Sequence, residues 1–342
     1  MWHEGRKPPR SNVVGMNAQL PRNQLGLRTG LTVSTIGTGL WSVAGSEWGP
    51  ADDRDSLAAI EASLESGVDF FDTADVYAGG HSEELLGRAM KGRRERFVVA
   101  TKIGWIDFDG EAGRSQYDTV SKLVAGVESS LRRLGTDYID VIQCHIYFTE
   151  PNTPVFIEGF RKLKEDGKVR AWGISTGELE PLRAFNADGD CDVLQIDYSI
   201  LNRMPEAEIL PYCRETGIGV IVRGGLAMGL LADKYDAAAT FPDNDFRHNW
   251  IDDPEQNQQF LQDLDTVASL RSVVPADQTM AQFALRFVAS HPAVSTAIPG
   301  ARNARQARSN AAAASLPRLS SEELGEIDRL VAPGGGRKIW PA

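Results

Sequence analysis

Short apolar segments alternate with longer amphipathic segments along most of the chain. Residues 98–101 read Val-Val-Ala-Thr, with Lys102 next, and such a short apolar run is typical of a parallel strand buried on both faces. Between residues 118 and 134, apolar side chains recur every three or four positions, which predicts a helix with one buried face. The chain is therefore predicted to alternate strand and helix.

Extended to the whole sequence, this pattern predicts a (β/α)8 TIM barrel of the α/β class with a long rim insertion and a C-terminal tail. The predicted strands are residues 33–40, 68–72, 97–101, 138–143, 169–174, 193–196, 218–222 and 294–298. The predicted helices are residues 53–66, 82–90 with Ser82 as N-cap, 118–134, 154–166, 177–186, 205–216, 280–290 and 304–314. A doubly wound dinucleotide domain would need GxGxxG after its first strand, and Gly37-Thr-Gly39-Leu-Trp-Ser lacks the third glycine.

The barrel is predicted to be a single domain over residues 25–330. Residues 1–24 are expected to form a flexible N-terminal extension, and residues 331–342 a C-terminal tail, either frayed or folded as a flap over the rim. Residues 226–257 form a polar segment too long for a barrel loop, and such segments are usually functional or disordered. Aromatic residues in this segment, including Trp250, argue against a bare linker.

Charge and cysteine content narrow the classes of partner. The 342 residues carry 36 Lys+Arg against 47 Asp+Glu, a net charge of −11, which argues against nucleic-acid or membrane-surface binding. No run of about 18 apolar residues predicts a membrane span, and the start of the chain lacks the apolar core of a secretory signal. Three widely spaced cysteines favour neither a disulfide scaffold nor a zinc site, so a cytoplasmic protein without metal is expected.

Three consecutive predicted strands end in residues that handle protons. Asp72 ends the second strand and Tyr77 follows it, Lys102 ends the third, and His145 follows the fourth. The carboxyl ends of barrel strands meet at one rim, where the active sites of such barrels lie. An acid, a phenol, an amine and an imidazole are therefore expected in one place.

This combination suits the reduction of a carbonyl group, which needs a hydride donor and a proton donor. A free tyrosine has a pKa near 10, so it is a weak acid at neutral pH. A neighbouring lysine lowers that pKa, and an aspartate can hold the lysine in place. Tyr77 is predicted as the general acid/base, Lys102 as its polarising neighbour and Asp72 as the anchor, with His145 hydrogen-bonded to the carbonyl oxygen. Asp75 is interpreted as a loop carboxylate.

These segments resemble the aldo-keto reductase family, and the resemblance runs from about Leu27 to Leu330. That family reduces carbonyl compounds with a nicotinamide cofactor and uses an Asp, Tyr, Lys and His tetrad in this order. The resemblance implies an oxidoreductase that transfers hydride between NADP(H) or NAD(H) and an aldehyde, ketone or sugar hemiacetal, with NADP(H) favoured. It also implies a small-molecule substrate and no metal.

Further segments match the cofactor groove of the family. The resemblance implies cofactor contacts from Trp41, Ser175, Thr176, Gln195, Arg223, Gly224, Leu226, Gly229, Gly300, Arg302, Gln306 and Asn310. Thr176 stands where the family usually has Asn, and Arg223 where it often has an aromatic residue that stacks on the nicotinamide. A guanidinium can stack on a planar ring or bind a phosphate, but a cation over the oxidised, positively charged ring is unfavourable. Asn303 is a candidate N-cap for the last helix.

Two other functions stay open at this point. Lys102 could form an imine in a Schiff-base barrel, although the cofactor segments argue against that class. The chain could also be a non-catalytic regulatory subunit that senses a nicotinamide nucleotide, because such members of the family can keep the tetrad. Trp41, Trp105 and either Trp250 or Trp340 are expected to wall the substrate pocket.

Overall fold

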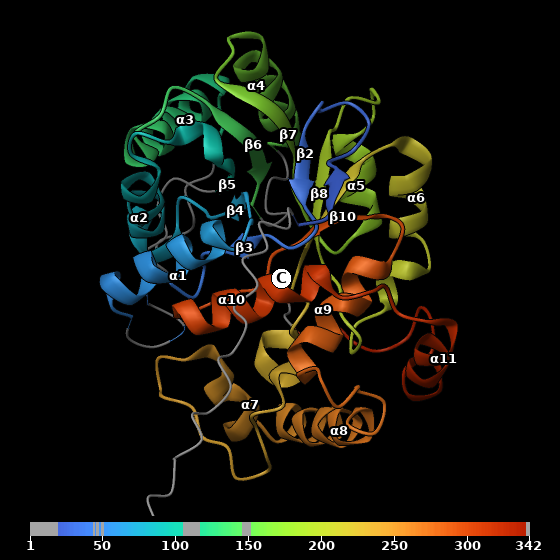
Figure 1. Cartoon of the computed structure of the whole chain (residues 1–342). Helices are drawn as coiled ribbons and strands as arrows, with labels where there is room; N and C mark the ends of the chain where they lie inside the picture. The colour runs from blue at the N-terminus through green and yellow to red at the C-terminus, as the bar shows by residue number, and fades with distance from the viewer. Residues whose placement is uncertain are drawn as a thin grey trace, which may run out of the picture.

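Eight parallel strands form a barrel at the centre of the molecule (Figure 1). The computed structural model describes residues 20–43, 45, 48, 51–104, 117–145 and 152–339. The strands lie side by side in chain order, and parallel bridges from Ile36 to Ala297 and from Gly39 to Gly300 join the last strand to the first. They are β3 (Thr38–Gly39), β4 (Phe70–Asp72), β5 (Val98–Ile103), β6 (Ile139–Cys144), β7 (Val169–Ser175), β8 (Val193–Asp197), β9 (Gly219–Arg223) and β10 (Val294–Ala297). The predicted barrel is confirmed.

The predicted first strand, residues 33–40, is wrong as a single element. Its first part, β2 (Thr32–Ser34), pairs antiparallel with β1 (Arg22–Gln24), and only β3 enters the barrel. The chain changes partner at Gly37, where an added Cβ would lie 2.9 Å from the carbonyl oxygen of Phe70. Only a glycine allows this close approach.

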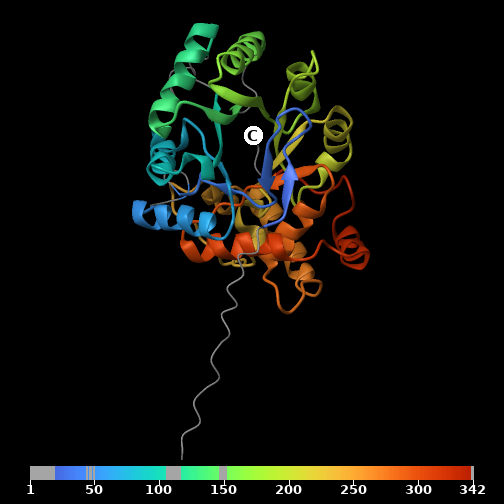
Figure 2. The same ribbon diagram turned by 45° about the horizontal axis from the view of Figure 1, so that its top comes forward.

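Helices surround the barrel as an outer ring (Figures 1 and 2). They are α1 (Asp53–Glu65), α2 (His81–Met90), α3 (Val120–Leu134), α4 (Thr153–Glu165), α5 (Leu179–Phe185), α6 (Ile209–Thr216), α9 (Met280–Ser290), α10 (Ala304–Ala312) and α11 (Ser321–Leu330). All were predicted to within a few residues except α11. The first and last barrel helices, α1 and α10, pack through small side chains that include Ala59, Ala62 and Ala307.

Ser82 is not the N-cap of α2, which corrects the sequence-based assignment. The helix begins one residue earlier, after Gly80, whose φ of 96° turns the chain into the helix. The Ser82 hydroxyl instead donates a hydrogen bond to the carbonyl of Leu40 (3.1 Å) and accepts one from Thr73 Oγ1 (2.8 Å). It therefore ties the start of α2 to the ends of two barrel strands.

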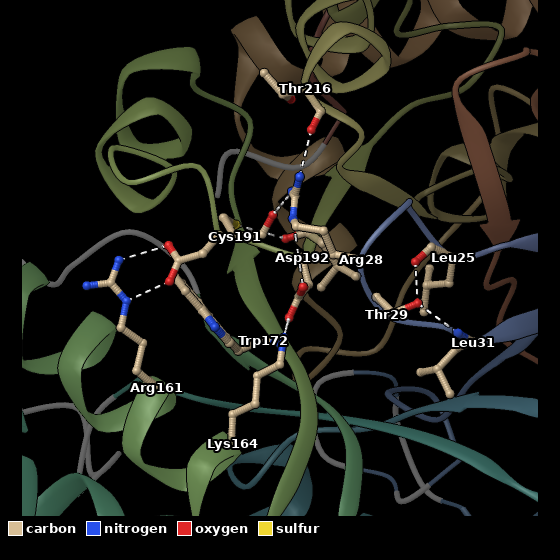
Figure 3. Close-up of polar contacts among 12 residues, drawn as sticks. Leu25, Arg28, Thr29, Leu31, Arg161, Lys164, Trp172, Cys191, Asp192 and Thr216 are labelled. Carbon is tan, nitrogen blue, oxygen red and sulfur yellow. Dashed lines mark hydrogen bonds and ion pairs between the residues drawn. The ribbon is translucent and has the colours of Figure 1, made fainter.

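The N-terminal hairpin closes the amino end of the barrel. Leu25, Leu31 and Val33 are buried against Phe70, Ile221 and other strand residues. Arg28 holds the hairpin loop: its guanidinium donates hydrogen bonds to the carbonyls of Thr216 (2.8 Å) and Cys191 and lies 3.9 Å from the buried carboxylate of Asp192 (Figure 3). This end of the barrel is a packed core, which leaves the opposite end for a site.

Residues 226–257 are folded rather than a simple loop. They contain η4 (Ala227–Ala232), η5 (Phe246–His248) and α7 (Asn249–Asp252) and lead directly into α8 (Pro254–Leu270), a helix that the sequence pattern did not predict. The buried Arg247 organises the segment. Its guanidinium is paired with Asp245, donates to the Met228 carbonyl (3.2 Å) and lies 4.8 Å from the Phe241 ring centre.

The described part of the C-terminal tail lies across the loops that follow β7 and β8. Gly336 forms a bridge with Asn202, the Ile339 N–H group hydrogen-bonds the Asp197 carboxylate, and Ile339 is buried. Lys338 pairs with Glu178, which immediately precedes α5. Residues 331–339 are therefore folded against these loops as a flap and are not frayed. Trp340 lies outside the described residues. In the described part of the chain, no helix is both long and apolar enough to span a membrane.

Candidate active site

The four proton-handling residues predicted from the sequence meet at the carboxyl end of the barrel. Asp72 ends β4, Lys102 lies in β5, and His145 directly follows β6. Because β4, β5 and β6 are adjacent and parallel, their ends lie at one rim. Tyr77 opens η1 (Tyr77–Gly80), the short turn between β4 and α2.

Lys102 is completely buried, and its ammonium group has three acceptors. Nζ donates to Asp72 Oδ1 at 2.6 Å, to the Thr73 carbonyl at 2.8 Å and to Tyr77 Oη at 3.2 Å. Burial, the largest single influence, acts to lower the pKa of Lys102, but the charges of Asp72 and Tyr77 and the hydrogen bonds they accept from Nζ together hold the pKa above its usual value. The lysine is therefore a fixed positive charge beside the phenol oxygen.

Asp72 is held from its other side by two glutamines. Its Oδ2 accepts hydrogen bonds from Gln195 Nε2 at 2.8 Å and from Gln143 Nε2 at 3.4 Å. The two amides also contact each other, with Gln195 Nε2 3.3 Å from Gln143 Oε1. Gln143 was missed in the sequence, although a polar residue inside the apolar run of a buried strand is a signal that could have found it.

Burial, more than charge, sets the acidity of Tyr77. Burial raises its pKa, and the charge of Lys102 offsets part of that rise. The sequence-based prediction considered Lys102 alone and therefore expected only a lowering of the Tyr77 pKa. The phenol is consequently protonated at neutral pH and able to donate a proton.

His145 is a neutral imidazole at neutral pH. Burial holds its pKa well below the usual value, and the charges of Lys102 and Arg223 act in the same direction. Its ring meets the Tyr77 ring edge to face, with centroids 5.6 Å apart and an interplanar angle of 82°. The phenol and the imidazole are therefore in direct contact, although of the two only Tyr77 lines the cavity described next.

A cavity of about 390 Å³ extends from this point to the start of α10. Its lining includes Asp72, Tyr77 and most of the predicted cofactor residues: Trp41, Gln195, Arg223, Gly224, Leu226, Gly229, Gly300, Arg302, Gln306 and Asn310. Ser175 and Thr176 are buried at the end of β7, next to Gln195, and do not line it. A volume of this size is typical of small-molecule and cofactor sites.

The far end of the cavity is an ordered loop before α10. Asn303 is the N-cap, as predicted, and its side chain accepts a hydrogen bond from the Gln306 N–H. The Gln306 side chain accepts from the Arg302 N–H (2.8 Å), and Asn310 donates to the Gly300 carbonyl (3.1 Å). Arg302 and Arg305 line the cavity at this helix start, an arrangement suited to phosphate.

The inserted segment contributes cavity residues that the sequence did not reveal. Lys234 and Arg247 line the cavity, as does Trp48 from the loop after β3. Trp250, predicted to wall the pocket, is instead buried against Phe241 and Phe260 inside the insertion. Trp105, a further predicted wall residue, lies outside the described residues.

Comparison with known proteins places this site in a family. The model of the Aldo/keto reductase family matches residues 35–332. The chain belongs to the aldo/keto reductase family. Among curated members, Bacillus subtilis aldo-keto reductase YhdN is 33% identical over 285 residues, which are 81% of this chain and 84% of the relative.

The chain is also similar to two proteins with different descriptions. A probable voltage-gated potassium channel subunit beta from Arabidopsis thaliana is 31% identical over 323 residues, 89% of this chain and 94% of that protein. A crystal structure of an aldo-keto reductase from Klebsiella pneumoniae in complex with NADPH is 28% identical, with a TM-score of 0.71 over 92% of this chain and 96% of that one.

Proposed function

We propose that this protein is an NADP(H)-dependent reductase of aldehydes, ketones or sugar hemiacetals, with Tyr77 as general acid/base. The observation that carries the proposal is the contact of Lys102 Nζ with both Asp72 Oδ1 (2.6 Å) and Tyr77 Oη (3.2 Å) at one end of an extended cavity. A buried, charge-paired lysine beside a protonated phenol is the arrangement that proton donation to a carbonyl requires.

The cofactor, when bound, supplies the hydride that reduces the carbonyl carbon. In the reduction, Tyr77 Oη donates its proton to the carbonyl oxygen, and the resulting phenolate is stabilised by the ammonium of Lys102. His145, being neutral, donates a hydrogen bond to the same oxygen and orients the substrate. Asp72 keeps Lys102 in place, and Gln143 and Gln195 keep Asp72 in place.

The residues that would hold the cofactor fit an elongated dinucleotide. Five glycines line the cavity, at positions 39, 224, 225, 229 and 300, and leave room for close approach of a ligand to the backbone. Gln195 would serve the nicotinamide end, with Ser175 and Thr176 behind it outside the cavity. Arg302, Gln306 and Asn310 would serve the adenosine end, with Lys234 added from the insertion.

A panel of aldehydes, ketones and aldoses, monitored at the nicotinamide absorbance with NADPH and with NADH, tests the proposal. Turnover by the native protein and its loss in Tyr77→Phe are the expected results. Equal turnover by the native protein and the variant would contradict the role of Tyr77.

The second candidate is a regulatory subunit that binds the nucleotide without turnover. It is favoured by the 31% identity to a protein named as a probable channel subunit. The same panel separates the two, because a sensor would bind NADPH in a fluorescence titration yet reduce none of the substrates. A Schiff-base enzyme is disfavoured, since Lys102 is protonated and all three of its N–H groups are engaged.

A further inference from the structure

A buried ion pair adjoins the turn that carries Tyr77. Glu83, in the first turn of α2, is completely buried, and its Oε2 accepts a hydrogen bond from Arg133 Nε of α3 at 2.7 Å. Glu83 Oε1 accepts a second hydrogen bond, from Thr101 Oγ1 at 2.6 Å. These three side chains do not line the cavity, so they would act on the reaction only through other residues.

The turn itself has an unfavourable backbone conformation. From Ala78 to Gly80, three successive residues have positive φ, at 49°, 63° and 96°. The left-handed region is unfavourable for a residue with a side chain, such as Ala78, and it persists where the surrounding structure enforces it. Tyr77 is the first residue of this turn, so loosening the contacts of the turn would also move the phenol.

Arg133 supplies a contact that encloses the turn. Its side chain lies so close to Gly80 that an added Cβ would be 2.6 Å from Arg133 Cδ and 2.7 Å from Nε. The guanidinium is fixed there by Glu83 and by Ser130, to whose Oγ its Nη2 donates at 3.2 Å. The carboxylate of Glu83 therefore holds the arginine against the turn.

The other hydrogen bond of Glu83 leads to the strand that carries Lys102. Thr101 directly precedes Lys102 in β5, and neighbouring side chains of a strand point to opposite faces. Thr101 contacts Glu83 in the helix layer, while Lys102 Nζ contacts Tyr77 Oη at 3.2 Å. One carboxylate thus connects the strand of Lys102 with the arginine that encloses the turn of Tyr77.

Stability alone explains this arrangement less well than positioning does. Transferring two charges out of water costs nearly as much as their attraction returns, so buried ion pairs add little to stability compared with apolar side chains. What such a pair does supply is a fixed geometry. Here the geometry that it fixes is the spacing between two elements that must bring a phenol and an ammonium group together.

We propose that Glu83 and Arg133 are positioning residues, which hold the turn of Tyr77 so that its hydroxyl stays within hydrogen-bond distance of Lys102. The proposal rests on the function proposed above, since it concerns the same proton transfer. A reacting group displaced by even a fraction of an ångström transfers its proton more slowly, although the cofactor and the substrate still bind.

The test is Glu83→Gln, assayed with a substrate that the native protein reduces. The amide keeps the shape of the side chain, and the Arg133 side chain, 26% exposed, stays hydrated, so the variant buries no unpaired charge. We expect kcat per NADPH-binding site to fall on the order of tenfold, with KM and the Kd for NADPH nearly unchanged. The solvent isotope effect on kcat, measured in H2O and D2O, should increase, because a misplaced phenol makes proton transfer limiting.

Variants of the arginine extend the test. Arg133→Gln should lower kcat in the same way as Glu83→Gln. Arg133→Lys keeps a cation opposite Glu83 and should recover part of the loss. If Arg133→Lys and Arg133→Gln have the same low kcat, the charge of the pair is not what holds the turn, and the proposal fails.

Asp140→Asn is the matched control. Asp140 is also a buried carboxylate paired with arginines, 2.7 Å from Arg94 Nη2 and 2.9 Å from Arg170 Nη1, but it lies near the start of β6, at the amino end of the barrel. Its replacement should reduce stability in urea while kcat per NADPH-binding site and the solvent isotope effect stay native.

The outcomes separate this inference from the proposed function. Native kcat in Glu83→Gln overturns the positioning role and leaves the reductase assignment standing. A lower kcat with a native solvent isotope effect, or an equal loss in Asp140→Asn, assigns the pair to packing and also overturns the role. A native protein that reduces no member of the carbonyl panel refutes the proposed function, and the positioning role with it.

Discussion

The indole of Trp41 lies parallel to the ring of Phe246, with centroids 5.8 Å apart and an interplanar angle of 9°. Trp41 also stacks on Tyr77, with centroids 6.1 Å apart and an interplanar angle of 23°. The inserted segment is thereby in contact, through one indole, with the proposed proton donor. The insertion thus helps to form the site although it lies outside the repeating strands and helices of the barrel.

Loss of this stack is predicted to weaken substrate binding. Aromatic pairs contribute about 0.5–1.5 kcal/mol beyond the area they bury, so Phe246→Ala should raise KM about two- to tenfold. Deleting the middle of the insertion, residues 237–244, of which only Phe241 is buried, should raise KM further and leave the barrel folded. Steady-state kinetics with circular dichroism would check both.

Asp243→Ala is the matched control, since this side chain is fully exposed in the same segment. The Asp243→Ala variant should have the KM of the native protein. If Phe246→Ala also has native kinetics, the insertion does not act on the site; if the deletion unfolds the protein, the segment serves packing instead.

Removal of the Tyr77 hydroxyl is predicted to stop proton transfer while keeping the ring in the stack. Tyr77→Phe should lower kcat about a hundredfold to ten-thousandfold, the usual contribution of a general acid, with the Kd for NADPH nearly unchanged. Lys102→Met should lower kcat as well, because the phenolate loses its cation. Tyr138→Phe removes a phenol that does not line the cavity and should have native kcat. Native turnover in Tyr77→Phe would refute the tetrad assignment.

The tetrad was predictable because each member lies at or just after the end of a short apolar strand, and strand ends can be read locally. The acidity of Tyr77 could not be predicted from the sequence, because the burial of its side chain depends on Trp41 and other residues that are distant in the chain. Lys234 and Arg247 were missed for a related reason: the 226–257 segment has no period, and its fold rests on contacts of Arg247 with Asp245, Tyr235 and aromatic rings. Trp48, in the loop after β3, was missed because its contact is with Arg247, which is distant in the chain. Ser82 was misassigned because Gly80, not a polar side chain, shapes the entry into α2.

Asp75 is predicted to make the protein less stable as the pH rises. Burial raises the pKa of Asp75 to about 8, and the Glu83 carboxylate adds to the rise, while Arg133 and Lys102 oppose it. The Oδ1 atom of Asp75 is buried and has no hydrogen-bond partner among the described residues. In the unfolded chain the pKa is about 3.9. The folded state therefore holds a proton that the unfolded state has lost, and stability falls between about pH 4 and pH 8.

Asp75→Asn removes this titration and should stabilise the protein at alkaline pH. The gain in the free energy of unfolding over the native protein should grow from pH 6 to pH 8, level off near pH 9, and reach about 1–3 kcal/mol, the usual cost of an unsatisfied buried polar group. Urea unfolding of both proteins at pH 6, 7, 8 and 9 measures it. A gain that does not change with pH would show that Asp75 is ionised in the folded state throughout this range.

Discrimination between NADP(H) and NAD(H) is predicted to depend on the loop before α10. The two cofactors differ by one phosphate on the adenosine ribose, so preference requires cations at that end of the cavity. Arg302 and Arg305 both line it, and Arg302 is held there by a 3.1 Å hydrogen bond to the Trp48 carbonyl. Gly300 before α10 and Gln306 in its first turn carry no charge, so at this helix start the discrimination depends on the two arginines.

A charge-assisted contact contributes about 1.5–3 kcal/mol, so Arg302→Ala should weaken NADPH binding roughly tenfold to a hundredfold and leave NADH binding nearly unchanged. Calorimetric titration of both cofactors measures the two affinities, and a rising salt concentration should reduce the NADPH preference of the native protein. Arg308→Ala, which removes the same type of side chain from α10 outside the cavity, should affect neither affinity. Equal losses for both cofactors in Arg302→Ala, or a native protein that prefers NADH, would show that these arginines do not recognise the phosphate.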